Sequence, residues 1–232
     1  MTADGDVYLP HLALTLTAGR EGALALPGTF TPSEQSVFLY CLYYEGLAIA
    51  QDAVQEQLGL SSASVSRALS SLCSRRLIDY EVGGMTGRRK LYAIPDKQQY
   101  YRDGFELFGN PVAKRYLASL AAYDEQPLFS GITALSALSS LTRSPRDVVA
   151  VGHAESKAII QAESHVSGHE KRYEVQVLRY DPRPISDMVW HGMSYVDPVT
   201  MALTIGEKER DERVSISLRN FMSERGYEWY AD

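Results

Sequence analysis

Residues 57–69, QLGLSSASVSRAL, and residues 77–94, LIDYEVGGMTGRRKLYAI, decide the fold of the first half of this chain. Gly59 predicts the end of one helix, because glycine adopts the left-handed conformation after a helix without steric cost. Ser61 predicts the start of the next helix, since its hydroxyl can accept a hydrogen bond from a free backbone N–H. The second segment predicts two strands joined by a glycine-rich turn. A helix, a tight turn, a second helix and a hairpin therefore follow one another without interruption.

The second helix has two faces of different character. Its apolar positions recur at helical spacing and are expected to be buried: Val65, Ala68, Leu69 and Leu72. The opposite face carries small side chains and one arginine: Ala63, Ser66, Arg67, Ser70 and Ser74, with Ser64 at its border. Glu and Lys usually dominate a solvated face, whereas small hydroxyl side chains suit a helix that enters the DNA major groove, about 12 Å wide. The alternative is a serine-rich amphipathic helix without a ligand.

The hairpin that follows carries a basic run beside three glycines. A cationic tip of this kind can lie along the phosphate backbone or reach a minor groove. A basic loop alone is usually a solvated turn, but directly after two such helices it indicates DNA binding. The predicted DNA-binding residues are Ser61, Ser62, Ala63, Ser64, Ser66, Arg67, Arg88, Arg89 and Lys90.

Residues 31–94 resemble the winged helix-turn-helix domain of MarR-type transcriptional regulators, in SASVSRALSSL (residues 62–72) and in the hairpin. The resemblance implies that the helix enters the major groove and that the hairpin, the wing, contacts the flanking backbone. It covers about a quarter of the chain, which continues far beyond a lone module of this family.

The charge distribution supports a local DNA contact. Six basic and two acidic residues between positions 61 and 94 give +4, and the net charge of −6 leaves −10 for the remainder. A basic module on an acidic body fits specific DNA binding better than a general nucleic-acid coat.

Composition bounds the class of protein. The 232 residues, 45% hydrophobic and 22% charged, predict one large or two ordinary globular domains. No apolar stretch reaches the roughly 18 residues of a membrane helix, and no secretory signal begins the chain, so we expect no membrane contact and a cytoplasmic location. The two cysteines, Cys41 and Cys73, are interpreted as small buried thiols, because nothing visible activates either one as a redox switch.

The sequence predicts an α+β chain of four segments: an N-terminal extension (1–30), the winged helix-turn-helix domain (31–95), a helical linker (96–126) and a C-terminal α/β domain (127–232). A capping box with proline at the first helical position, residues 31–34, predicts the start of a largely apolar helix. The linker predicts two helices, over 97–107 and 112–122, that build a dimer or bridge the domains. Its tyrosines and those near residue 43 line an aromatic pocket or fill the core, and we favour fill.

The C-terminal segment alternates helices and strands. Ser130 is expected to cap a helix through Leu141, and further helices are expected over 154–162, 198–205 and 211–225. Strands are expected over 148–151, 173–180 and 193–196. This half distantly resembles the C-terminal domain of AbiEi-type antitoxins, in FSGITAL (residues 129–135) and YVDP (residues 195–198). The resemblance implies a repressor of its own operon that also counters a toxin.

No active site is apparent. His165 and His169 have a spacing compatible with a metal on a helix, but the glycine and serines around them favour a loop. Glu155 and Asp181 do not form the closely spaced carboxylate pair of a Mg²⁺ site, and no phosphate-binding glycine loop precedes a helix. We therefore expect no enzyme activity, no metal and no cofactor.

These patterns predict a sequence-specific DNA-binding transcriptional regulator, a repressor acting as a homodimer on double-stranded DNA. A protein partner or a small-molecule effector at the C-terminal domain is a further expectation. The alternative is an AbiEi-like antitoxin that autoregulates its operon and counters a partner toxin.

Overall fold

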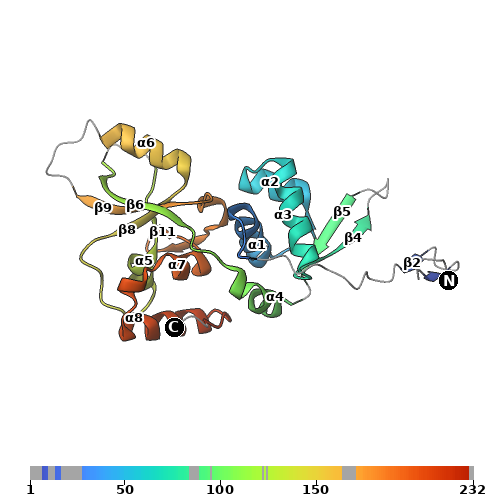
Figure 1. Ribbon diagram of the computed structural model, residues 1–232. Helices are drawn as coiled ribbons and strands as arrows, with labels where there is room; N and C mark the ends of the chain where they lie inside the picture. The colour runs from blue at the N-terminus through green and yellow to red at the C-terminus, as the bar shows by residue number, and fades with distance from the viewer. Residues whose placement is uncertain are drawn as a thin grey trace.

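The computed structural model describes residues 7–9, 14–16, 28–83, 89–94, 96–121, 123, 125–163 and 171–229. These residues form a mixed α+β fold, which confirms the predicted class (Figure 1). A short hairpin, β1 (Val7–Leu9) and β2 (Leu14–Leu16), precedes the two main parts of the chain.

The first part holds three helices and a small sheet: α1 (Pro32–Tyr43), α2 (Gln51–Leu58), α3 (Ser62–Ser74), β3 (Ile49–Ala50), β4 (Asp79–Gly83) and β5 (Arg89–Ala93). The strands are antiparallel in the order β3-β5-β4. Helix α1 begins at the predicted capping box, where Thr31 N–H donates to the Glu34 carboxylate at 2.7 Å. The Glu34 N–H donates in return to the Thr31 hydroxyl at 3.3 Å. The predicted start and burial of this helix are confirmed, since it packs against α2 and α3.

The second part is built on a mixed six-stranded sheet in the order β10-β11-β7-β8-β9-β6. Its strands are β6 (Val112–Ser119), β7 (Leu128–Phe129), β8 (Val148–Val151), β9 (Arg172–Leu178), β10 (Met188–Trp190) and β11 (Met193–Tyr195). The pairs β8–β9 and β11–β7 are parallel, and the other neighbours are antiparallel. Strand β8 is buried along its whole length, as its four apolar residues predict.

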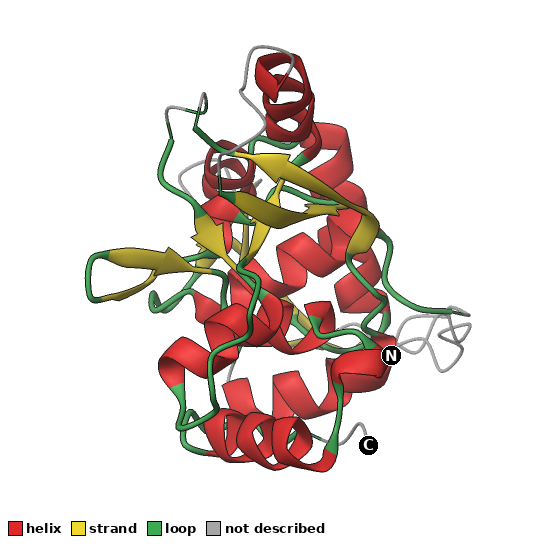
Figure 2. Ribbon diagram, turned by 90° about the vertical axis from the view of Figure 1, so that its left-hand side faces the viewer, coloured by secondary structure: helices red, strands yellow, loops and turns green. Residues whose placement is uncertain are grey.

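Helices cover both faces of this sheet (Figure 1). They are α5 (Gly131–Leu138), α6 (His153–Glu163), α7 (Pro198–Thr204) and α8 (Glu212–Ser223), with short 3-10 helices η2 (Arg183–Ile185) and η3 (Glu207–Glu209). Helix α6 lies on one face, and α5, α7 and α8 lie on the other. The hairpin of β10 and β11 projects from the edge of the sheet (Figure 2).

The prediction of a helix over residues 112–122 is wrong, because residues 112–119 form β6. This strand pairs antiparallel with β9 from Val112↔Leu178 to Ser119↔Arg172. Alanine, leucine, lysine and arginine favour a helix locally, but pairing along β9 overrides that weak preference. The other linker helix is confirmed as α4 (Lys97–Gly104), followed by η1 (Phe105–Leu107).

The prediction that Ser130 caps a helix through Leu141 is confirmed for the position, since Ser130 is the N-cap residue of α5, but it is wrong for the end of the helix and for the cap hydrogen bond. Helix α5 ends at Leu138, and the Ser130 side chain makes no cap hydrogen bond. Its hydroxyl instead lies 3.1 Å from the Gln176 amide oxygen, to which it donates, and 2.9 Å from the Thr204 hydroxyl. Buried polar groups on β9 and α7 thus take the hydroxyl that would otherwise have capped the helix.

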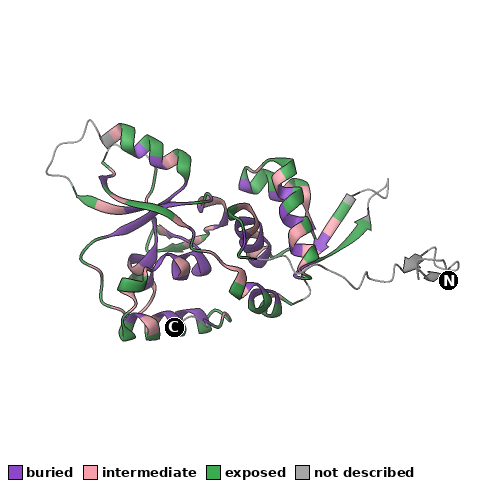
Figure 3. Ribbon diagram, viewed as in Figure 1, coloured by how far each residue is buried: buried purple, intermediate pink, exposed green. Residues whose placement is uncertain are grey.

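A continuous buried core runs from the first part into the second (Figure 3). At its centre, the Phe38 ring of α1 stacks on Tyr100 of α4 with 4.0 Å between centroids. Tyr101 lies 5.0 Å from the Tyr227 ring, close to the end of the chain. These linker aromatics therefore fill the core, in agreement with the interpretation favoured from sequence.

A buried polar contact joins the two parts as well. The Tyr43 hydroxyl donates to Asp197 Oδ1 at 2.9 Å, and Asp197 caps α7 by accepting from Thr200 N–H at 3.0 Å. Asp197 is 1% exposed. Because α1 carries Tyr43, this contact attaches the first helix directly to the C-terminal body.

Candidate nucleic-acid interface

The turn between α2 and α3 forms for local reasons. Gly59 ends α2 with φ 61° and ψ 21°, the left-handed region that glycine adopts readily. Ser61 caps α3, since its hydroxyl accepts from Ser64 N–H at 3.2 Å. Gln51, at the start of α2, donates to the Ser62 carbonyl at 3.3 Å and to its hydroxyl at 3.2 Å. The two helices are thus held together at the turn by side-chain contacts.

Helix α3 buries the predicted stripe and exposes the predicted face. Val65, Ala68, Leu69 and Leu72 are at most 1% exposed. Residues 61–63, 66, 67 and 70 are exposed, and Ser64 is half-buried at the border. The predicted DNA-binding residues on this helix therefore share one surface, with Ser64 at its edge.

The serines of this surface differ in what they already bind. Ser61 and Ser64 hydroxyls lie 2.9 Å apart, and the Ser62 hydroxyl accepts from Gln51. Within the described ranges, neither the Ser66 hydroxyl nor the Arg67 guanidinium has a hydrogen-bond partner. Ser61, Ser62 and Ser64 therefore help to build the turn.

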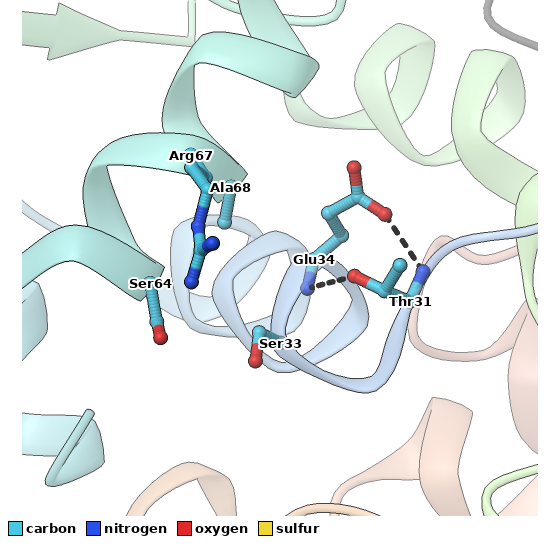
Figure 4. Close-up of a pocket in the computed structure, with 6 residues that line it drawn as sticks. All are labelled: Thr31, Ser33, Glu34, Ser64, Arg67 and Ala68. Atoms are coloured by element: carbon cyan, nitrogen blue, oxygen red, sulfur yellow. Dashed lines mark hydrogen bonds between the residues drawn. The ribbon is translucent and has the colours of Figure 1, made fainter. Parts of the chain in front are cut away.

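A hollow of about 370 Å³ lies beside this surface, between α3 and the start of α1 (Figure 4). Arg67 and Ser64 reach into it from α3, and Ser33 faces them from α1. Glu34 lies at the rim of this hollow, and its pKa is lowered. Burial by itself would raise the pKa, but hydrogen bonds from Ser71 and Thr31 outweigh that effect. The anionic Glu34 is thus engaged with its own helix cap, and the Arg67 cation remains available.

Residues 31–34 were predicted only as a helix cap, and their position beside Arg67 was not predicted. The sequence holds no signal for that proximity, because it depends on how α1 packs against α3.

Lys90, a predicted contact residue, is exposed on β5, and its Nζ lies 4.3 Å from the centroid of the Tyr80 ring. Val82 pairs with Lys90 and Tyr80 with Tyr92, so these four side chains share one face of the sheet. Arg88 lies outside the described residues, and of Arg89 only the backbone in β5 is described. The structure therefore places one of the three predicted basic side chains of the hairpin.

The second part of the chain contacts the end of α2, just before the turn. The Gln57 side chain donates to the Pro184 carbonyl at 3.2 Å. A second hollow of about 370 Å³ separates residues 58–60 from the ends of β8 and β9, where it is lined by His153, Arg179 and Asp181. Partial burial raises the pKa of Asp181, and a hydrogen bond from Arg183 N–H opposes this effect.

The described residues contain no cluster of three or more histidine, cysteine, aspartate or glutamate side chains that could hold a metal. His165 and His169, the pair weighed as metal ligands, lie outside the described residues. Glu155, weighed as part of a catalytic carboxylate pair, instead accepts hydrogen bonds from Tyr123 and Arg183, both at 2.5 Å. No helix in the described part of the chain is long and apolar enough to cross a membrane.

Comparison with known proteins found no matching protein-family model, curated protein or solved structure.

Proposed function

We propose that residues 31–94 form a winged helix-turn-helix domain that binds double-stranded DNA. The chain would then be a sequence-specific transcriptional regulator, a repressor that acts as a homodimer. The exposed face of α3 carries the proposal, because Ser66 and Arg67 have no intrachain partner among the described residues while the opposite face is fully buried.

The size and chemistry of that face suit a DNA groove. Small side chains at residues 62, 63, 66 and 70 allow a helix to approach base edges closely. Arg67 can donate two hydrogen bonds to guanine, or grip a phosphate oxygen. The adjacent hollow, with the Ser33 and Ser64 hydroxyls near Arg67, supports a phosphate contact at the border of the helix.

The hairpin of β4 and β5 supplies the second proposed contact, as the wing. Lys90 is exposed there, and Arg88 and Arg89 precede it in the chain. Lysine and arginine beside a DNA backbone release condensed counterions, so their contribution depends on salt. Because the rest of the chain is acidic, we expect DNA contact to be confined to α3 and the wing.

The hollow between the turn and the C-terminal sheet supports regulation from behind the DNA-binding helix. A small-molecule effector or a protein segment bound near Arg179 and Asp181 would contact residues 58–60 directly. The proposed role of the C-terminal domain is therefore to set the position of α3.

The direct test measures binding to DNA from upstream of the protein's own gene, by footprinting and by fluorescence anisotropy. Arg67→Ala is expected to weaken specific binding by about 1–3 kcal/mol, roughly 5- to 150-fold, and to relax sequence preference. Arg219→Ala on α8 is the matched control, since it removes the same charge from an exposed position on the acidic body.

Arg67→Lys separates the two possible contacts of Arg67. Lysine keeps the charge but loses the planar pair of donors, so a base contact loses specificity and a phosphate contact keeps most of the affinity. Equal binding by wild type, Arg67→Ala and Arg219→Ala would refute the placement of α3 in the groove.

The wing is tested through the salt dependence of the same binding. Replacing Arg88, Arg89 and Lys90 with glutamine should flatten the slope of log K against log salt by about 0.9 for each phosphate that the wing no longer neutralises. An unchanged slope would remove the wing from the interface.

A further inference from the structure

The β10–β11 hairpin exposes large apolar side chains at the edge of the six-stranded sheet. Val189 is 67% exposed, Trp190 52% and Met193 41%. Strand β10 is the outermost strand, with β11 on one side and no strand on the other in the described sheet. Proteins normally protect such edges with charged residues or proline, because an apolar edge strand is a template for pairing with another chain.

The geometry of the hairpin shows which backbone groups face the free edge. His191 and Gly192, with φ of 48° and 74°, form a two-residue turn between Trp190 and Met193. The pair that flanks such a turn exchanges both of its backbone hydrogen bonds, and the next pair exchanges none. The N–H and C=O of Val189 therefore point away from β11, toward the open edge.

Pairing with a second copy of β10 about a two-fold axis at Val189 is self-complementary. In an antiparallel pair centred there, each Val189 would donate to and accept from the partner's Val189. Asp187 would then lie opposite the partner's His191, the first residue of the turn, so that a carboxylate and an imidazole face each other twice. An imidazole N–H can donate a hydrogen bond to a carboxylate, whereas two carboxylates at the same positions would repel each other.

The same register also covers the exposed tryptophan. Met188 pairs with Tyr195, and Trp190 pairs with Met193, so Met188 and Trp190 share one face of the hairpin. Trp190 would lie opposite the partner's Met188, at a position without backbone hydrogen bonds, where side chains approach most closely. Methionine sulfur packs favourably against aromatic rings.

We propose that β10 is the dimer interface of this protein, and that two copies join their six-stranded sheets through antiparallel β10 strands centred on Val189. This strand would be the contact surface of the homodimer proposed above. Its geometry rests on the hairpin alone and does not depend on DNA binding.

The first test is the mass of the full chain in solution, measured by light scattering over a range of concentrations. The wild type is expected at twice the 25.8 kDa of one chain. Val189→Pro is expected at the mass of one chain, because proline removes the N–H at the two-fold axis. An edge strand tolerates proline where that N–H faces solvent, so the fold of one copy should be retained. Val189→Thr keeps both the β-branched shape and the N–H, and is the matched control that should remain dimeric.

Tryptophan fluorescence provides a second measurement of dimerisation. It does not depend on whether the Val189→Pro variant folds. The chain has two tryptophans, Trp190 and Trp229, and Trp229 is only 8% exposed. Burial of Trp190 should shift the emission of the wild type to shorter wavelength as concentration rises. Trp190→Phe should abolish that shift.

The pairing of Asp187 with the partner's His191 is tested by exchanging the two residues. His191→Asp places like charges opposite each other at both pairs and should weaken dimerisation by roughly tenfold or more. Aspartate is one of the residues that tolerate a positive φ, so the turn should persist. The double variant D187H/H191D restores a carboxylate opposite an imidazole at both pairs and should recover the dimer.

Three results would overturn the proposal: a wild type that stays at one chain's mass up to concentrations on the order of 100 μM, a Val189→Pro dimer as stable as wild type, or no recovery in the double variant. DNA binding by a monomeric wild type would leave the proposed function standing while this interface fails. A wild type that dimerises as expected but binds no DNA would leave this interface standing while the proposed function fails.

Discussion

Replacing Asp197 would test how strongly the first helix is held to the C-terminal body. The Asp197 carboxylate is buried, and its Oδ1 accepts hydrogen bonds from the Tyr43 hydroxyl and the Thr200 N–H. Its Oδ2 is buried without a hydrogen-bond partner in the part of the chain that the structure describes. One oxygen atom therefore both caps α7 and anchors α1.

The expected cost follows from these contacts. Asp197→Ala removes a helix cap, which contributes about 1 kcal/mol. It also leaves the buried Tyr43 hydroxyl without its acceptor, at a cost of about 1–3 kcal/mol. The free energy of unfolding should fall by roughly 2–4 kcal/mol. Asp197→Asn keeps an acceptor oxygen for both donors, and should cost less than about 1 kcal/mol.

The asparagine variant should also change the dependence of stability on pH. Burial raises the pKa of Asp197, although hydrogen bonds from Thr200 and Tyr43 oppose the shift. A carboxyl whose pKa is raised by folding favours the folded state most below its unfolded pKa, and this contribution is lost as pH rises through the folded pKa. Asparagine does not titrate. The stability of Asp197→Asn relative to wild type should therefore increase with pH from about pH 4 upward.

Urea unfolding followed by far-ultraviolet circular dichroism, at pH 5 and pH 7, measures both effects. A double-mutant cycle with Tyr43→Phe isolates the energy of the contact between the two parts. The reasoning would be refuted if Asp197→Ala cost less than about 1 kcal/mol, or if alanine and asparagine cost the same.

Two further perturbations test the core. A Cβ at Gly104 would lie 2.4 Å from the buried Phe38 ring, which is itself stacked on Tyr100, so Gly104→Ala should destabilise by about 1–3 kcal/mol. An unchanged melting temperature would contradict this packing. Burial raises the pKa of the Cys41 thiol to about 12, so at pH 8 a thiol reagent should modify the half-buried Cys73 long before Cys41. Alkylation followed by peptide mass spectrometry measures the order, and rapid labelling of Cys41 in the native protein would disprove its burial.

The predictions that succeeded concern structure encoded by near neighbours. Gly59 and Ser61 delimit their helices, and residues 31–34 form the capping box, because each involves hydrogen bonds or backbone angles within about four positions. The buried and exposed faces of α3 were predictable for a similar reason, since helical periodicity places them without reference to the rest of the fold.

The predictions that failed concern residues whose state depends on distant partners. Residues 112–119 favour a helix locally, yet they pair with β9 about 60 positions later in the chain. Ser130 is the N-cap residue of α5, yet its hydroxyl forms hydrogen bonds with Gln176 and Thr204 and not with the helix backbone. Weak local preferences of this kind yield to packing and to the need of buried polar groups for partners.

By itself, then, the sequence determined the order of the three helices and the two hairpin strands in the first part, although not β3, as well as the polar face of α3 and the basic run of the hairpin. Only the tertiary structure decided which of those serines are engaged in the turn, that Ser33 faces Arg67 across a hollow, and that Asp197 holds Tyr43. It also placed β10 at the edge of the six-stranded sheet that the described residues form. The division is physical: periodicity and capping act within a few residues, whereas contacts between helices and the order of strands depend on how the whole chain packs.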